Sequence, residues 1–110
     1  MSKGEMKMLA RKRVEIFVEA PLLRRVVAAL DELGVPGYSL MDIIGGRGGG
    51  AAWDQNGEIG NASRMVCIVS LVDPDRVEII LQRLSGIIAG RIGVTAISDV
   101  LVMTGEDYIA

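Results

Sequence analysis

The sequence has 110 residues, the size of one ordinary domain, and half of them are hydrophobic. Its formal net charge of −2 argues against nucleic acid as the main partner, because phosphate binding requires a basic surface. Histidine is absent, which removes the commonest acid–base group and metal ligand and excludes Ser-His and Cys-His catalysis. Because the single cysteine, Cys67, cannot form an internal disulfide, it fits a reducing compartment, and we expect a cytoplasmic protein.

The N-terminal residues 1–12 are polar and basic, and we expect them to form a flexible leader. No apolar stretch follows that is typical of a signal peptide, and none is long enough to span a bilayer, so no membrane insertion is expected. The folded domain is predicted over residues 13–104, with a C-terminal tail over residues 105–110.

Residues 14–19 alternate between two sets of side chains with period two, which predicts a strand. A helix is predicted over residues 21–33, because Pro21 suits a first helical turn and the apolar residues that follow have helical spacing. Gly34 is a plausible stop for this helix. A second strand is predicted over residues 37–45.

Residues 45–62 differ in composition from the rest of the chain, because half of its 14 glycines lie there and no periodic apolar face exists. A long loop inside a compact domain is usually functional or disordered. Trp53 is unusual in such a loop, and two roles are open for it: an anchor for a partner protein, or packing back onto its own assembly.

The second half of the chain repeats the pattern of the first. Residues 64–72 form an almost continuous apolar run after Arg64, which suits a strand covered on both faces. Asp73 is the expected N-cap of a second helix, with Pro74 at its first position, and Gly90 closes that segment. Residues 92–103 are predicted to form the last strand.

The predicted order β-α-β-loop-β-α-β indicates an α+β, ferredoxin-like βαββαβ fold with a four-stranded antiparallel sheet. Two helices can cover only one face of such a sheet, yet the last two strands look apolar on both faces. The uncovered face therefore needs a partner, and subunit association is the simplest one.

Two glycine-basic segments are the candidates for binding chemistry. The first, Gly45-Gly46-Arg47-Gly48-Gly49-Gly50, allows close backbone approach to an anion, and Arg47 adds a positive charge suited to a phosphate oxygen. The alternative is a flexible linker between strands. The second, Gly90-Arg91-Ile92-Gly93, is either a partner for the same anion or an ordinary helix C-cap followed by a strand. Arg64 either points at that cleft or only marks the end of a strand.

The order and spacing of these motifs resemble the PII signal-transduction superfamily over residues 13–106. The matching segments are Gly37-Tyr38-Ser39, Gly45-Gly46-Arg47-Gly48 with the long loop after it, Gly90-Arg91-Ile92, and Thr104-Gly105-Glu106. The resemblance implies a homotrimer that binds an adenine nucleotide in clefts between subunits. Residues 46–62 would be the T-loop, which changes shape with the ligand and docks onto a transporter or an enzyme.

By this resemblance the chain is a regulator and not an enzyme, with no catalytic residues, no metal site and no covalent cofactor. The expected nucleotide-binding residues are Ser39, Gly45, Gly46, Arg47, Gly48, Arg64, Gly90 and Arg91. Trp53 is the expected contact for a protein partner.

Several residues differ from those of classical PII proteins, and these differences limit which ligands we expect. The loop lacks the tyrosine that classical members modify, and Gly48 or Gly49 replaces their Mg-ATP-binding glutamine. Two arginines of the classical last strand fall at about Leu101 and Met103. With fewer cations for three phosphates, we expect ADP or AMP to be preferred over ATP, and no binding of 2-oxoglutarate. The chain looks closer to the PII-like proteins linked to inorganic-carbon uptake and carboxysomes, some of which respond to bicarbonate.

Two other interpretations remain open. A trimeric ferredoxin-like protein of the CutA type would share the fold without sensing nucleotides, although the lack of histidine weakens a metal-related role. A small ferredoxin-like enzyme would need a polar constellation facing a pocket, and the spacing of polar residues provides none. Asp42 and Asp99 lie in apolar strands, where they would face a subunit interface or an exposed edge.

Overall fold

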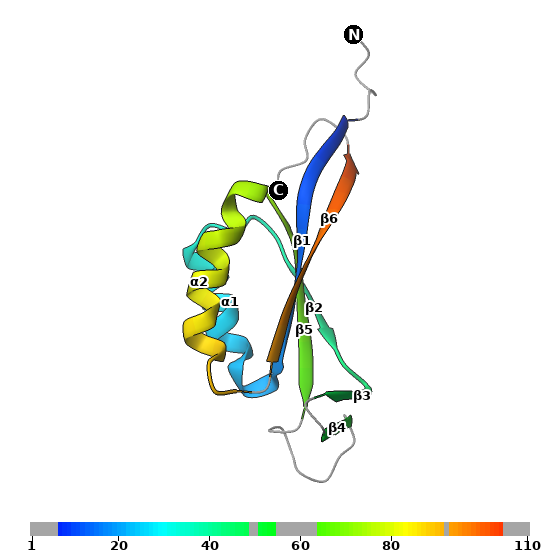
Figure 1. Cartoon of the computed structure of the whole chain (residues 1–110), viewed down its shortest axis with the longest axis vertical. Helices are drawn as coiled ribbons and strands as arrows, with labels where there is room; N and C mark the ends of the chain where they lie inside the picture. Colours follow the sequence, from blue (N-terminus) through cyan, green and yellow to red (C-terminus); the bar gives the residue numbers. More distant parts are fainter. Residues whose placement is uncertain (1–6, 49–50, 55–63, 92, 105–110) are drawn as a thin grey trace.

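The computed structural model describes residues 7–48, 51–54, 64–91 and 93–104. Four strands form one antiparallel sheet in the order β2-β5-β1-β6. They are β1 (Lys7–Glu19), β2 (Ser39–Asp42), β5 (Met65–Val72) and β6 (Gly93–Thr104). The helices α1 (Leu23–Glu32) and α2 (Val77–Ile88) lie side by side on one face of this sheet (Figure 1). The ferredoxin-like α+β prediction is confirmed.

Both helices are preceded by a short 3-10 turn that contains a proline. The turn η1 (Ala20–Leu22) has Pro21 near its start, and η3 (Pro74–Arg76) begins at Pro74. The side chain of Asp73 accepts a hydrogen bond from the backbone N–H of Asp75 at 2.9 Å, so the predicted cap is confirmed. Gly34 and Gly90 follow the two helices with φ of +73° and +76°, the left-handed conformation expected of helix-ending glycines.

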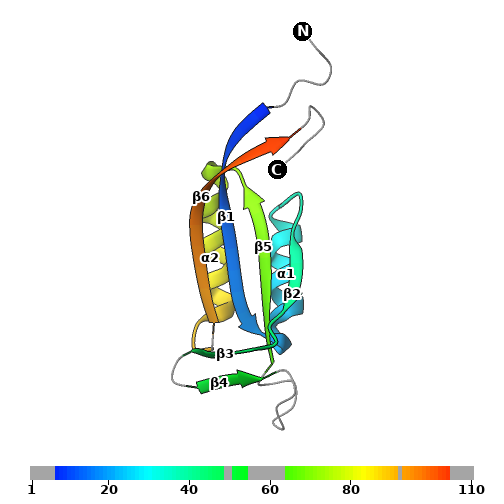
Figure 2. The same ribbon diagram turned by 90° about the vertical axis from the view of Figure 1, so that its right-hand side faces the viewer.

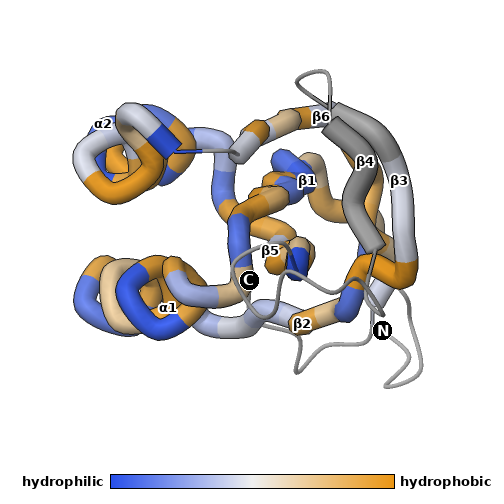
Figure 3. The backbone as a smooth tube through the Cα atoms, turned by 90° about the horizontal axis from the view of Figure 1, so that it is seen from below, coloured by the Kyte–Doolittle hydropathy of each residue, from blue (hydrophilic) through white to orange (hydrophobic). Residues whose placement is uncertain are grey.

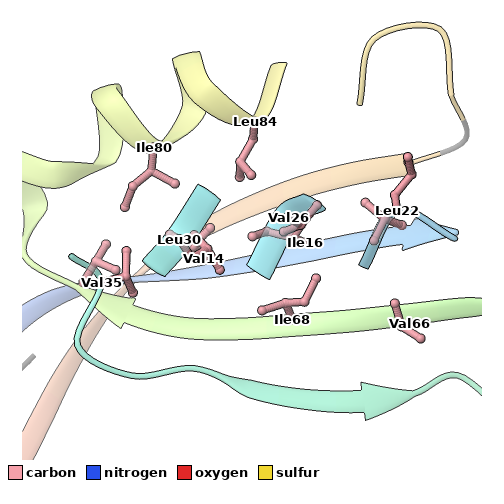
Figure 4. Close-up of a cluster of buried hydrophobic side chains, with 12 residues drawn as sticks. Val14, Ile16, Leu22, Val26, Leu30, Val35, Val66, Ile68, Ile80 and Leu84 are labelled. Atoms are coloured by element: carbon pink, nitrogen blue, oxygen red, sulfur yellow. The ribbon is translucent and has the colours of Figure 1, made fainter. Parts of the chain in front are cut away.

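The core lies between the helices and the sheet (Figure 4). Ile16 and Ile68 are paired residues of β1 and β5, and both are fully buried. They face Val26 and Leu30 from α1 and Leu84 from α2, which are equally inaccessible. Burying each large aliphatic side chain contributes about 1.5–3 kcal/mol, so each of these residues makes a substantial contribution to the stability of the fold.

Strand β1 begins earlier than the sequence predicts. Residues 7–12 were expected to belong to the flexible leader, but they pair with residues 99–104 of β6 in register, from Lys7↔Thr104 to Lys12↔Asp99. The leader prediction is wrong for these six residues, because the three basic side chains, Lys7, Arg11 and Lys12, are compatible with a ribbon whose hydrogen bonds come from the backbone. The β1–β6 ribbon extends past the helix layer (Figure 1). Residues 1–6 and the tail 105–110 lie outside the described residues.

The glycine-rich segment contains structure that its composition did not predict. Strands β3 (Gly45–Gly48) and β4 (Ala51–Asp54) form a two-stranded antiparallel hairpin, with Arg47 paired to Ala52 and Gly46 paired to Trp53. The hairpin lies beyond one end of the main sheet and is displaced toward the face without helices (Figure 3). Backbone pairing does not require a periodic apolar face, so the pattern of side chains did not predict this hairpin. The predicted loop residues 55–62 lie outside the described residues.

Candidate functional site

The two glycine-basic segments are at the same end of the sheet. The antiparallel register places the end of β1, the start of β5, the end of β2 and the start of β6 together, through the pairs Val18↔Val66, Asp42↔Val66 and Val18↔Gly93. The chain leaves β2 toward the hairpin there, and β6 begins there after α2. Figure 2 shows the hairpin crossing this end of the sheet.

Within one chain these two segments start from opposite edges of the sheet. Strand β2 is one edge and β6 is the other, with β5 and β1 between them. Three strand spacings of about 4.8 Å separate the edges by about 14 Å. The β3–β4 hairpin runs across this gap, from the β2 side toward the β6 side (Figure 2). Its glycine backbone, including the predicted Gly45, Gly46, Arg47 and Gly48, is therefore carried toward the second segment.

The root of the hairpin is closed by an ion pair. Nη2 of Arg64, just before β5, lies 2.8 Å from Oδ1 of Asp42, the last residue of β2. The backbone around the pair is fixed as well: Ile43 N–H donates to the Met65 carbonyl at 3.1 Å, and Ala20 N–H donates to the Arg64 carbonyl at 2.9 Å. Arg64 therefore joins β2, β5 and the turn before α1.

Asp42 is the residue of this site whose role the sequence analysis missed. It was expected at an interface or an exposed edge, and its partner was not identified. The available signal was a pair of opposite charges flanking the long loop, with Asp42 before it and Arg64 after it. Ser39, another predicted site residue, is exposed at the start of β2 and pairs with Val69.

The second segment is a tight connection between α2 and β6. Arg91 N–H donates to the Ile88 carbonyl at 2.9 Å, and the Arg91 side chain is exposed. Gly93 is packed so closely that a methyl group there would lie 3.0 Å from Cγ2 of Ile88 and 3.0 Å from the Phe17 carbonyl oxygen. The segment thus holds an exposed arginine on a backbone that is fixed at both ends.

The apolar residues Leu101 and Met103 lie at the other end of β6. About eight residues at 3.3 Å each separate Leu101 from Gly93, a distance of about 26 Å. Both side chains are about two-thirds exposed, on the part of the β1–β6 ribbon beyond the last β1–β5 pair, Lys12↔Val72. Neither supplies a charge, and neither reaches the loops of its own chain.

The sheet face without helices carries an apolar row near the hairpin end of the sheet. Phe17, Cys67, Met41 and Val94 form one row across the four strands, as the register shows. Met41 is 44% exposed and Val94 is 57% exposed, whereas Cys67 is buried. Burial, together with the charge of Glu15, raises the pKa of the Cys67 thiol. The prediction that the last two strands are apolar on this face is confirmed for Cys67 and Val94, whereas β1 also places the Arg13–Glu15 ion pair there, because these residues alternate with the buried Val14 and Ile16.

Three hollows in the described chain lie away from the loops. One is lined by Val35, Val72 and Arg76 near the end of α1, another lies beside Lys12 and Asp99, and a third lies between the two helices. In the described part of the chain, no helix is long and apolar enough to cross a membrane.

The fold and the two glycine-basic segments define the class of protein. It is a ferredoxin-like domain with a β-hairpin after its second strand and a glycine-basic turn before its last strand. The model of the family "Nitrogen regulatory protein P-II" matches residues 11–107, and the chain belongs to this family. This match favours the PII interpretation over the CutA-like one. No match was found among curated proteins.

Solved structures show the same fold. CPII, a nitrogen regulatory PII-like protein from Thiomonas intermedia K12, is 22% identical over 87% of this chain and 91% of that one, with a TM-score of 0.78; it is bound to ADP, AMP and bicarbonate. A PII-like signalling protein from Thermus thermophilus is 24% identical over 94% and 99% of the two chains, with a TM-score of 0.74. A DUF3240 family protein from Shewanella baltica is 14% identical over 88% and 89%, with a TM-score of 0.64.

Proposed function

We propose that this PII-like regulatory protein senses an adenine nucleotide, ADP or AMP in preference to ATP, at the hairpin end of its sheet. The observation that carries the proposal is the position of the two glycine-basic segments, which lie at the same end of the sheet on different edges. Backbone N–H groups of Gly45–Gly48 and the charges of Arg47, Arg64 and Arg91 are the proposed phosphate contacts.

The site is completed by a second copy of the chain. A homotrimer built through the apolar sheet face would cover Met41 and Val94 and would bring the edge of one subunit to the loops of the next. The nucleotide then occupies a cleft between subunits, with Ser39 on its wall. The structures of Thiomonas CPII with ADP, AMP and bicarbonate support this ligand class, and bicarbonate is the proposed second ligand.

The role of the bound nucleotide is regulatory rather than catalytic. It changes the shape of the T-loop, proposed over residues 46–62, and Trp53 within this loop anchors a partner protein such as a transporter or an enzyme. The partner belongs to inorganic-carbon metabolism in this proposal, and the protein acts in the cytoplasm.

The test is calorimetric titration of the full chain with AMP, ADP and ATP, with and without bicarbonate. Arg47→Ala is expected to weaken ADP binding by about 1–3 kcal/mol, which is about 5- to 150-fold in Kd, the scale of a charge-assisted hydrogen bond. Arg25→Ala, on the exposed side of α1, is the matched control and should leave Kd unchanged. The absence of a binding signal with all three nucleotides would refute the proposal.

A further inference from the structure

The Asp42–Arg64 pair places a carboxylate on a cation at the root of the hairpin. The two side chains meet at 2.8 Å and remain partly exposed, at 52% for Asp42 and 34% for Arg64. Their position does not depend on the pair alone, because the β2–β5 ladder and the Ile43 N–H to Met65 carbonyl bond also hold the two backbones together.

A carboxylate and a phosphate oxygen make the same kind of contact with a guanidinium group. Both accept charge-assisted hydrogen bonds in the plane of the arginine fork, so the Asp42 carboxylate occupies a donor of Arg64 that an incoming phosphate would use. Ion pairs that solvent reaches this freely are weak and are exchanged easily. A polyanionic ligand can therefore displace Asp42 from Arg64, whereas an uncharged ligand has no means to do so.

We propose that Asp42 is a specificity-determining residue that competes with the ligand's phosphate groups for Arg64. This inference rests on the proposed nucleotide site and adds a residue to it. In the ligand-free chain Asp42 neutralises Arg64, and binding exchanges the internal carboxylate for a phosphate. The exchange lowers the affinity for every phosphate-bearing ligand and leaves the affinity for the adenosine moiety unaffected.

The experiment compares Asp42→Asn with the wild-type chain by calorimetry, using ADP and adenosine. Asparagine keeps the size of the side chain and removes its charge. Asp42→Asn is expected to tighten ADP binding about 3- to 10-fold, because the exposed ion pair with Arg64 no longer has to be broken. Adenosine binding should be unchanged. The matched control is Asp99→Asn, which removes a carboxylate that pairs with Lys12 near the middle of β1 and β6, away from the hairpin.

A double-mutant cycle separates competition from a general change of charge. In an Arg64→Ala background, Asp42→Asn should give no further gain in ADP affinity, because the contested guanidinium is absent. An ADP affinity that is unchanged or weaker in Asp42→Asn would overturn the inference and leave the nucleotide site intact, as would an equal gain in both backgrounds. Absence of ADP binding to the wild type and to both variants would refute the proposed function and this inference with it.

Discussion

Gly93, near the candidate site, is packed so closely that no larger residue fits there without movement of its neighbours. A methyl group there would meet Ile88 Cγ2 and the Phe17 carbonyl oxygen, both at 3.0 Å, where ordinary contacts lie at 3.4–4 Å. The Ile88 side chain can rotate away, but Phe17 is fixed between Cys67 and Val94 in the centre of the sheet. The clash with a backbone oxygen therefore has to be relieved by moving the start of β6.

Gly93→Ala is thus expected to lower the free energy of unfolding. Overpacking of this kind costs about 1–3 kcal/mol, and alanine returns about 0.4–1 kcal/mol by restricting the unfolded chain. The net loss is centred on about 1 kcal/mol and reaches at most about 2.6 kcal/mol, and each kcal/mol lowers Tm by about 4–8 °C for a domain of this size. Urea and thermal unfolding at one fixed protein concentration measure it, because association shifts Tm.

The matched control is Gly86→Ala in α2. A methyl group at Gly86 has no heavy atom within 4 Å, so the same substitution there gains helix propensity and is expected to stabilise the chain by about 0.5–1 kcal/mol. The two variants should move in opposite directions. A Gly93→Ala protein as stable as the wild type would show that the start of β6 is not held against Phe17.

Three further predictions concern the thiol, the second helix and the uncovered face. Because burial raises the pKa of the Cys67 thiol above its ordinary value of 9.0, the neutral thiol is favoured in the folded chain. The neutral thiol contributes fully to the free energy of unfolding at pH values below 9.0, and this contribution is lost as the pH rises through the pKa of the folded state. Cys67→Ala should therefore reduce the loss of stability at alkaline pH, measured by urea unfolding. Asp73→Ala removes the hydrogen bond to Asp75 N–H and should cost about 1 kcal/mol in the same assay, whereas Asp73→Asn should cost less. Val94→Lys places a charge in the apolar face and should raise the subunit dissociation constant about 100-fold or more in sedimentation experiments, while a sheet face that plays no part in association would leave it unchanged.

Most of the fold was predictable because local patterns and the tertiary structure agree. The period-two alternation of residues 14–19, the proline-led turns and the two helix-ending glycines each mark an element that the structure contains. The start of β1 was not predictable, because residues 7–11 join the sheet through backbone pairing with β6 and do not pair with β5. A pattern of side chains carries no signal for that pairing.

The loops of the candidate site could be located from the sequence, but the ion pair between Asp42 and Arg64 could not. Glycine-rich composition indicated both segments as candidates without predicting the hairpin, and of the glycines in the two described segments Gly90 takes the left-handed conformation, with φ of +76°. The contact between Asp42 and Arg64 depends on the register of β2 against β5, which brings residues 22 positions apart to within 2.8 Å. Register follows from the whole sheet, so the sequence offered two charges near a loop and no reason to pair them.

The exposed apolar residues and the separation of the two basic loops both favour association with a second subunit. The helices cover one face of the sheet, which leaves Met41 and Val94 on the other face in contact with water. Met8, Leu101 and Met103 are more than half exposed on the part of the β1–β6 ribbon that does not pair with β5. The basic loops, in turn, start from opposite edges of the sheet in one chain. In the proposed homotrimer, a partner subunit that covers the apolar face would also place a sheet edge beside a neighbour's loops. The stability of the assembly and the formation of the proposed nucleotide cleft would then depend on the same contact. For this reason a variant that dissociates the assembly should lose nucleotide binding even when every proposed phosphate contact is intact.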